Sequence, residues 1–208
     1  MTPRHQLMKD GSPVTGTAHS PDNVFIGSPT SHEVVFIGPV GVGKTTAVET
    51  LSSIPTINTE ARLSSHADLS PEHTPLKQST TVGLDIGLWE RPDGTLVGLY
   101  GTPGQDRFVA CRTPMLNPQA GIVIWLYGNS ATLMDDLYHW LDVAGGSAQA
   151  HRLTVALNYA TTSSLADVQG SLRKHGYRGV PVHLVDPRRE EEVRQLVTTA
   201  ITRQGLHA

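Results

Sequence analysis

The sequence predicts an α/β fold in which a central, mostly parallel sheet carries helices on both faces. Short apolar runs alternate along the chain with stretches whose apolar residues recur at helical spacing. The apolar runs are nearly continuous, as in strands that are buried on both sides of a sheet. The chain has 208 residues, 38% of them hydrophobic, which suits one such domain with a substantial core.

Six strands are expected, and two of them should form one antiparallel hairpin at an edge of the sheet. The runs at 82–89 and 95–100 flank Arg91-Pro-Asp-Gly94, a turn signal that favours such a hairpin. The other four expected strands are the apolar runs at 34–37, 121–127, 153–157 and 180–185.

Four helices are expected between and after these strands. The first begins near Lys44, directly after a Gly-rich turn. The others are marked by apolar residues at helical spacing. These residues are Leu133, Leu137, Trp140, Leu141 and Ala144; Leu165, Val168 and Leu172; and Val193, Leu196, Val197 and Ile201.

The chain divides into an N-terminal tail at 1–31 and one folded domain at 32–208. The tail is rich in Pro, Ser, Thr, Gly and His, with one local apolar cluster at 24–26. Such a segment buries too little surface to offset the entropy cost of ordering it, so we expect it to be flexible. The alternative is an arm that docks on the domain or on a partner through residues 24–26.

Composition and charge exclude several classes of protein. A single Cys excludes a disulfide framework and a thiolate zinc cluster. The formal charge of −3 gives no general electrostatic reason to bind nucleic acid. The longest apolar run, at 121–127, is far shorter than the ~20 residues of a spanning helix, and neither terminus carries a signal peptide or lipidation motif. We therefore expect a cytoplasmic protein without direct membrane insertion.

The turn after the first strand carries a phosphate-binding motif typical of P-loop NTPases. The segment at 38–45 (GPVGVGKT) fits G-x-x-x-x-G-K-[ST] and stands between an expected strand and an expected helix, the context that the motif requires. Its glycines let backbone N–H groups approach phosphate oxygens, Lys44 would reach the β- and γ-phosphates, and the Thr45 hydroxyl would ligate Mg²⁺. The alternative is an ordinary Gly-rich turn with a solvated lysine. The residues expected to bind nucleotide here are Gly38, Val40, Gly41, Val42, Gly43, Lys44, Thr45 and Thr46.

A second motif follows the hairpin, in the segment at 100–108 (YGTPGQDRF). A loop at this place lies beside the phosphate loop in a parallel sheet of this kind. The Gly104 N–H would sense a γ-phosphate, and Gln105 would orient the attacking water. Upstream, Thr80 or Thr81 would complete the Mg²⁺ shell, although a surface threonine that merely favours a strand explains either residue nearly as well.

Together these features resemble the Ras-like small GTPases. They are the phosphate loop, the paired threonines before a strand, the hairpin and the sequence P-G-Q-x-R-F, and the resemblance covers residues 33–204. The form GTPGQDRF, without the usual acidic first residue, looks like a bacterial branch: the gliding-motility polarity GTPases and the GTP-binding proteins of actinobacterial conservons. The resemblance implies a switch between GDP and GTP states with Mg²⁺, slow intrinsic hydrolysis, a roadblock-type activator protein and an effector protein.

The first departure from the family pattern is Gly101, which replaces the Asp that holds a Mg²⁺-bound water. Asp85, in an otherwise apolar expected strand, is our candidate for the missing charge near Mg²⁺. Gly83 and Gly87 share its face and leave room for something to approach. The alternative is a carboxylate paired with a neighbouring arginine or hydroxyl.

The second departure concerns the base. The guanine-reading N-K-x-D of the family appears here as Asn158-Tyr-Ala-Thr161, so the Asp that would pair with the guanine N1 and N2 hydrogens is missing. Guanine preference is therefore inferred from kinship. Asp186, after the last strand, would compensate as a nucleotide-binding residue. The stronger alternative is that Asp186 caps the final helix, with Pro187 at the first helical position.

The third departure is a long polar segment with three prolines between the first helix and the hairpin, at 54–80. Loops longer than ~12–15 residues are usually functional or mobile, so we interpret this one as an extended switch I that nucleotide or a partner orders. Arg62 would act as an internal arginine finger, as in this branch of the family, and Arg107 and Arg112 are rival candidates. For each of them the alternative is a surface arginine.

The leading hypothesis is a cytoplasmic GTPase that acts as a molecular switch, with Gln105, Lys44 and Arg62 as catalytic residues. A second hypothesis is a non-catalytic nucleotide-binding scaffold that regulates a partner. Gly101 and Thr161 favour it, because each removes a carboxylate. A P-loop ATPase or small-molecule kinase fits less well, because the hairpin and the P-G-Q loop are features of the Ras-like layout.

Overall fold

The described chain begins just before the first strand. A computed structural model describes residues 29–62, 79–104 and 117–204; at 59–62, 79–82 and 204 it describes the backbone alone. Most of the expected tail, at 1–28, lies outside these residues, as does the alternative docking arm at 24–26. Ser31 donates its backbone N–H to the Leu96 carbonyl over 2.9 Å, so the chain enters the sheet directly from this point.

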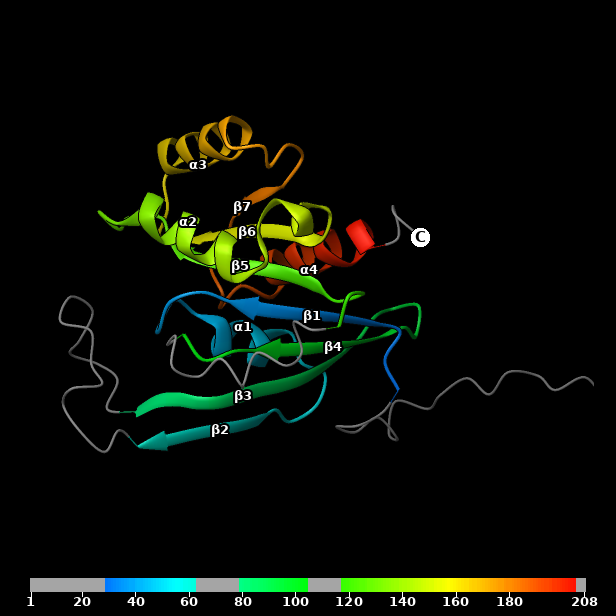
Figure 1. Ribbon diagram of the computed structural model, residues 1–208. Helices are drawn as coiled ribbons and strands as arrows, with labels where there is room; N and C mark the ends of the chain where they lie inside the picture. The colour runs from blue at the N-terminus through cyan, green and yellow to red at the C-terminus, as the bar shows by residue number, and fades with distance from the viewer. Residues whose placement is uncertain (1–28, 63–78, 105–116, 205–208) are drawn as a thin grey trace, which may run out of the picture.

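Seven strands of the described chain form one mixed sheet in the order β2-β3-β4-β1-β5-β6-β7 (Figure 1). Their bounds are β1 His32–Ile37, β2 Ile57–Arg62, β3 Ser79–Glu90, β4 Leu96–Gly101, β5 Gly121–Tyr127, β6 Leu153–Asn158 and β7 Val182–Leu184. Strands β4, β1, β5, β6 and β7 run parallel to one another, whereas β3 is antiparallel to both β2 and β4. The predicted α/β fold, with a mostly parallel sheet and an antiparallel hairpin, is confirmed.

Strand β2 corrects the prediction of six strands. It lies within the polar segment at 54–80 that we interpret as a loop, and it pairs antiparallel with β3. Its sequence, INTEAR, contains no apolar run, and Ile57 is 43% exposed, so burial gives no signal for it. Backbone pairing to β3 at the edge of the sheet forms this strand, and the pattern of side chains does not report such pairing.

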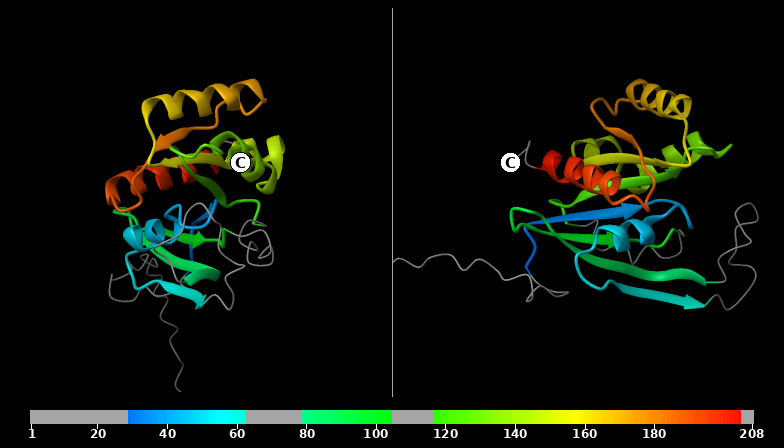
Figure 2. Two further views of the ribbon diagram at one scale, coloured as in Figure 1. Left: turned by 90° about the vertical axis from the view of Figure 1, so that its left-hand side faces the viewer. Right: turned by 180° about the vertical axis from the view of Figure 1, so that it is seen from behind.

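In the described residues, four α-helices and one 3₁₀ helix cover the two faces of the sheet (Figure 2). Their bounds are α1 Lys44–Leu51, α2 Leu133–Val143, η4 Gly146–Arg152, α3 Thr162–Lys174 and α4 Glu190–Gln204. Helices α1 and α4 pack on one face, and α2 and α3 pack on the other. Each helix of this described part is too short or too polar to span a bilayer.

The alternation of side chains along each strand divides the core into two layers. In β1, Val34 and Phe36 pack with α1 and α4, while Val35 and Ile37 pack with α2 and α3. All four side chains are fully buried. Because both faces are covered, the central strands appear in the sequence as nearly continuous apolar runs.

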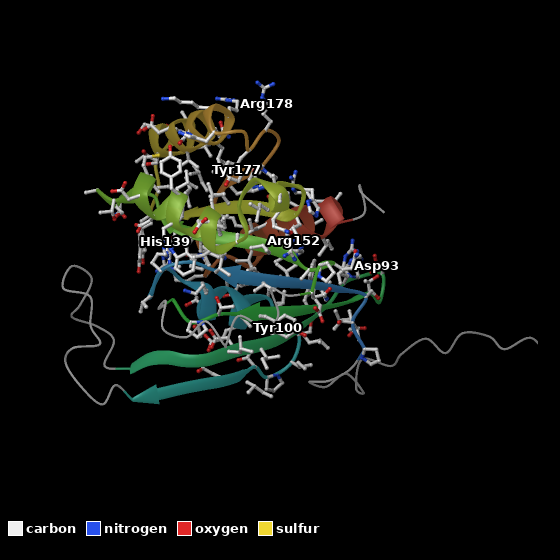
Figure 3. The ribbon with its side chains drawn as sticks, viewed as in Figure 1. Asp93, Tyr100, His139, Arg152, Tyr177 and Arg178 are labelled. Atoms are coloured by element: carbon white, nitrogen blue, oxygen red, sulfur yellow. The ribbon has the colours of Figure 1, made fainter. Side chains whose placement is uncertain are left out.

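A buried arginine fixes the start of β5, at the end of the sheet opposite the phosphate-binding motif (Figure 3). Arg152 donates from Nη1 to the carbonyls of Asn117 and Ala120, over 2.7 and 3.0 Å, and from Nε to the Gln149 side chain over 2.7 Å. Burial lowers the pKa of its guanidinium. These bonds tie the 3₁₀ helix η4, which contains Gln149 and Arg152, to the turn that precedes β5.

Replacing Leu137 by Ala tests the core layer under α2 and α3. Leu137 is fully buried, so the cavity left behind should lower the free energy of unfolding by ~2–5 kcal/mol, measured by denaturant titration. The control Lys174→Ala, at an exposed position of α3, should stay within ~0.5 kcal/mol of the parent protein. A loss below ~1 kcal/mol at Leu137 would contradict this packing.

Candidate functional site

The phosphate-binding motif forms the loop between β1 and α1, at the carboxyl end of β1. Lys44, the first residue of α1, is 6% exposed, and its Nζ donates to the carbonyls of Gly38 and Pro39 over 2.7 Å each. The lysine thus reaches back over the start of the loop. The other residues predicted to bind nucleotide here occupy the loop and the first turn of α1; they are Val40, Gly41, Val42, Gly43, Thr45 and Thr46.

Two side chains from neighbouring strands hold the loop by its carbonyl groups. The Tyr127 hydroxyl, at the end of β5, donates to the Val40 carbonyl over 3.0 Å. The Asn158 Nδ2, at the end of β6, donates to the Val42 carbonyl over 2.9 Å. Burial, and in smaller part Tyr159, raises the pKa of Tyr127 to about 12, so the phenol keeps its donor proton at neutral pH.

Gly38 lets the loop pass directly over β5. Its φ is +140°, and a Cβ at this position would lie 2.1 Å from the Trp125 carbonyl oxygen. Trp125 is itself fully buried and packs edge-on against Phe36, with ring centroids 6.1 Å apart. Any larger residue at 38 would push the loop off the sheet.

The segment after β4 lies against the phosphate loop. Thr102 donates both its N–H and its hydroxyl to the Phe36 carbonyl, each over 3.0 Å. Two residues later, a Cβ at Gly104 would lie 2.4 Å from the Val40 nitrogen, so the two backbones are in direct contact. Gly104 is thus brought to the loop, while Gln105 lies outside the described residues.

Asp85 and Thr45 meet beside the loop. The Thr45 hydroxyl donates to Asp85 Oδ2 over 2.6 Å, and Asp85 is 2% exposed. Asp85 stands directly opposite Gly101 in the β3–β4 pair, and a Cβ at Gly101 would lie 2.8 Å from Asp85 Oδ2. The carboxylate on β3 therefore uses the space that a side chain at 101 would fill. The alternative prediction, that Asp85 is paired with a neighbouring hydroxyl, is therefore correct. The hydroxyl belongs to Thr45, the residue expected to ligate Mg²⁺, so this contact is also compatible with the metal role predicted for Asp85.

The room that Gly87 leaves on β3 is taken by α1. A Cβ at Gly87 would lie 2.8 Å from Val48 Cγ1 and 3.1 Å from the Ser52 side chain. The Ser52 hydroxyl also accepts the Leu88 N–H over 3.1 Å. Gly87 thus permits the close packing of α1 on β3, because a side chain at this position would clash with Val48.

The residues after β6 are engaged in local structure. Asn158 accepts the Tyr159 N–H on its Oδ1 over 2.9 Å, in addition to its bond to the phosphate loop. Thr161 is the N-cap of α3: its hydroxyl accepts the Ser164 N–H, and the Ser164 hydroxyl accepts the Thr161 N–H. Thr161 therefore presents a neutral side chain that caps a helix, and no carboxylate, at this position.

Asp186 binds Arg188 in the turn before α4. Its Oδ1 accepts from the Arg188 N–H and Nε over 3.0 and 2.9 Å, and its Oδ2 accepts from Nη2 over 2.8 Å. These bonds, led by the side-chain contact, lower the pKa of Asp186 to about 2.

The predicted cap of the final helix by Asp186, with Pro187 at its first position, is wrong. Because the carboxylate closes a turn onto Arg188, α4 begins only at Glu190. Pro187 instead approaches the phosphate loop, since a Cβ at Gly43 would lie 2.5 Å from its Cγ.

Sequence reasoning misses two tyrosines at this end of the sheet. Tyr127 and Tyr159 stack on each other, with ring centroids 6.2 Å apart and ring planes 16° apart. One residue ends β5 and the other directly follows β6. Ligand sites of parallel sheets gather at the carboxyl ends of strands, and this rule is the signal that could have found both.

Several predicted site residues are not placed with the others. Thr80 and Thr81 lie in β3 and Arg62 lies in β2, where the backbone alone is described. A strand rises ~3.4 Å per residue, so Thr81 lies ~14 Å along β3 from Asp85. Thr81 and Asp85 therefore do not lie close enough to ligate one ion while the start of β3 is paired with β2. Outside the described residues lie Gln105, Arg107 and Arg112.

Comparison with solved structures finds similar folds. A bacterial selenocysteine-specific elongation factor, EF-Sec, matches with a TM-score of 0.54 and 19% identity, over 82% of this chain and 29% of that chain. A variant of S. thermophilus NFeoB, in a structure bound to GDP, matches with a TM-score of 0.49 and 18% identity, over 83% of this chain and 61% of that chain. This chain therefore spans less than a third of the elongation factor. No family model and no curated protein matches. At 19% identity the similarity to the elongation factor shows the fold alone, an α/β domain with a mostly parallel sheet and an antiparallel edge pair.

Replacing Asn158 by Asp tests the anchor of the loop, because it keeps the shape of the side chain and removes the donor to the Val42 carbonyl. Asn158 is 6% exposed, so the free energy of unfolding should fall by ~1–3 kcal/mol in a denaturant titration. The same change at exposed Asn129 should stay within ~0.5 kcal/mol. Equal stability of the two variants would show that the contact with Val42 does not hold the loop.

Proposed function

We propose that the protein is a small GTP-binding molecular switch that hydrolyses GTP to GDP slowly with Mg²⁺. The observation that carries the proposal is the convergence of three segments on one loop. Lys44 comes from α1, Asp85 comes from β3 through its bond to Thr45, and Gly104 follows β4. A backbone cradle, a cation, a hydroxyl and a carboxylate are the groups that bind nucleotide phosphates with Mg²⁺.

The phosphates would bind through backbone N–H groups of the loop. The loop carbonyls at 38, 39, 40 and 42 accept hydrogen bonds from side chains of the protein, which leaves the opposite edge of the peptide groups for an anion. The N-terminus of α1 adds partial positive charge at the same place. Lys44 would contact the β- and γ-phosphates as a point charge.

The oxygen atoms beside the loop suit Mg²⁺. This ion is usually held by one or two protein oxygens together with phosphate oxygens and water, and the Thr45 hydroxyl and the Asp85 carboxylate form such a pair. When bound, the ion offsets negative charge on the β- and γ-phosphates. Asp85 would supply from β3 the charge that Gly101 does not supply from β4. Thr80 or Thr81 would join the shell only if the start of β3 separates from β2.

Hydrolysis would proceed by attack of a water oxygen on the γ-phosphorus. The bond from phosphorus to the β–γ bridging oxygen breaks, and GDP and inorganic phosphate leave, the phosphate having taken up a proton of the water. Gln105, next to Gly104, would orient the water. Lys44 would stabilise charge that develops on the phosphate oxygens, and Arg62 would add to it as an internal arginine finger.

A switch needs a segment whose arrangement depends on the γ-phosphate. The contact between Gly104 and Val40 links the phosphate loop to the segment that begins after β4, so a γ-phosphate bound to the Gly104 N–H would bias that segment. A roadblock-type activator and an effector protein would read the biased state. We propose that this happens in the cytoplasm, with no nucleic acid involved and no direct membrane insertion.

A catalytically impaired nucleotide-binding scaffold that regulates a partner is the second candidate. Thr161 favours it, because the threonine hydroxyl caps α3 and offers no carboxylate to a guanine base. Asp186 would have to exchange its contact with Arg188 for the base. The scaffold would bind nucleotide with almost no turnover, whereas the switch would turn over slowly, and faster with a partner.

Calorimetric titration with GTP, GDP and ATP in Mg²⁺, followed by a phosphate-release assay, separates these candidates. The switch predicts binding of GTP and GDP with slow phosphate release. Lys44→Ala should weaken binding by at least ~10-fold, because a charged hydrogen bond to phosphate is lost, while Lys174→Ala should bind as the parent protein does. Tight GTP binding without release would favour the scaffold, and a preference for ATP would contradict a GTPase.

Replacing Gln105 by Leu tests the water-positioning role. The variant loses the amide that would orient the attacking water, so phosphate release should fall by ~100-fold or more while GTP affinity stays within ~3-fold. Gln119→Leu, the same change at an exposed position before β5, should leave both quantities unaltered. Undiminished turnover in the Gln105 variant would remove this residue from the proposed mechanism.

Moving a carboxylate between the paired strands tests the role of Asp85. Asp85→Gly should weaken Mg²⁺-dependent GTP binding by ~10-fold, and adding Gly101→Asp to it should restore most of that loss, because the two residues are directly opposite. Gly101→Asp alone should bind worse than the parent, since two carboxylates would crowd one place. Magnesium titrations of folded variants measure all three effects. An unchanged Mg²⁺ dependence in Asp85→Gly would exclude Asp85 from the site.

A further inference from the structure

Tyr159 is a large aromatic residue that the fold leaves 61% exposed. It directly follows β6, and its backbone lies in the left-handed region, with φ of +52°. Among the described residues it is the single non-glycine residue with a positive φ. This conformation is uncommon for a bulky side chain and costs free energy, and such residues cluster at functional sites. The position of this ring therefore calls for an explanation other than core packing.

The ring of Tyr159 is held close to the phosphate loop. One of its faces stacks on Tyr127, which donates to the Val40 carbonyl. The preceding residue, Asn158, donates to the Val42 carbonyl. Tyr159 thus lies next to two of the residues that hold the loop, because it follows Asn158 in the chain and stacks on Tyr127. The ring surface that Tyr127 does not cover is exposed.

The polar groups that would pair with the edge of a base have other contacts. Thr161 caps α3, and both carboxylate oxygens of Asp186 accept from Arg188. The pKa of Arg188 is raised mainly by Asp186 and in smaller part by Tyr159, so the ring and this turn are near each other. Stacking needs only a flat ring face, and it therefore stays available at a site whose edge-pairing groups are engaged.

We propose that Tyr159 is the base-stacking residue of the nucleotide site, and that this ring rather than pairing to the base edge supplies the affinity for the base. The inference rests on the proposed function, which supplies the phosphate site. The ligand class is a purine nucleoside di- or triphosphate, whose base lies on the ring face turned away from Tyr127. Because every base has a π face, stacking discriminates weakly. Guanine and hypoxanthine, which differ by the 2-amino group, therefore bind alike.

Displacement of a fluorescent GDP analogue from the full-length protein tests this inference, with GDP, inosine diphosphate and inorganic pyrophosphate as competitors. Tyr159→Ala should weaken both nucleotides by ~10-fold and leave pyrophosphate unchanged, because pyrophosphate has no base. Alanine keeps the Cβ, so the variant does not gain the backbone freedom that a glycine would have at this φ. Tyr159→Phe keeps the ring and should bind within ~2-fold of the parent. Tyr138→Ala, at an exposed tyrosine of α2, is the matched control.

Three outcomes would overturn the inference. The first is nucleotide affinity in Tyr159→Ala within about threefold of the parent. The second is an equal loss for pyrophosphate, which would mean that the ring acts on the loop. The third is GDP binding that exceeds inosine diphosphate binding by ~10-fold or more in the parent protein, which would mean that the base edge is read. Failure of the proposed function looks different, because the parent would then bind neither GDP nor pyrophosphate and Lys44→Ala would change nothing.

Discussion

The site depends on one constraint: the loop between β1 and α1 is held to the sheet by its carbonyl groups. Side chains from α1, β5 and β6 donate to four of these carbonyls, and Gly38 lets the loop pass in contact with the Trp125 carbonyl. The peptide groups are thereby oriented by the protein itself. Such orientation in advance is what makes a set of backbone dipoles effective toward an anion.

The two sides of this loop depart from the Ras-like pattern in different ways. On the phosphate side the change is local, because Asp85 and Gly101 are directly opposite and a carboxylate from either strand reaches the same place. On the base side Thr161 caps a helix, and the nearby carboxylate of Asp186 is bound by Arg188. The carboxylate proposed for Mg²⁺ thus comes from β3 in place of the neighbouring strand β4, while recognition of a base would depend on other groups.

Most of the fold could be predicted, because burial on both faces of the sheet leaves continuous apolar runs such as those of β1, β5 and β6. The loop between β1 and α1 could be predicted too, since its backbone geometry selects glycine within a short local motif. β2 could not, because an exposed edge strand is formed by backbone pairing and its side chains carry no pattern. The contact of Tyr127 with Val40 depends on how distant segments meet. The predicted helix cap by Asp186 is wrong because two local partners compete for one carboxylate, and Arg188 is favoured over the helix N-terminus.

Backbone hydrogen exchange of residues 38–46, with and without saturating GDP and Mg²⁺, tests the central claim most directly. If the N–H groups of this loop bind phosphate oxygens, their exchange should slow by at least ~10-fold on adding GDP, while the exposed turn at 91–94 should not change. Slowing at the loop that Lys44→Ala abolishes would support the account in full. Unchanged exchange throughout 38–46 at saturating GDP would contradict it, because the loop would then not be the phosphate site.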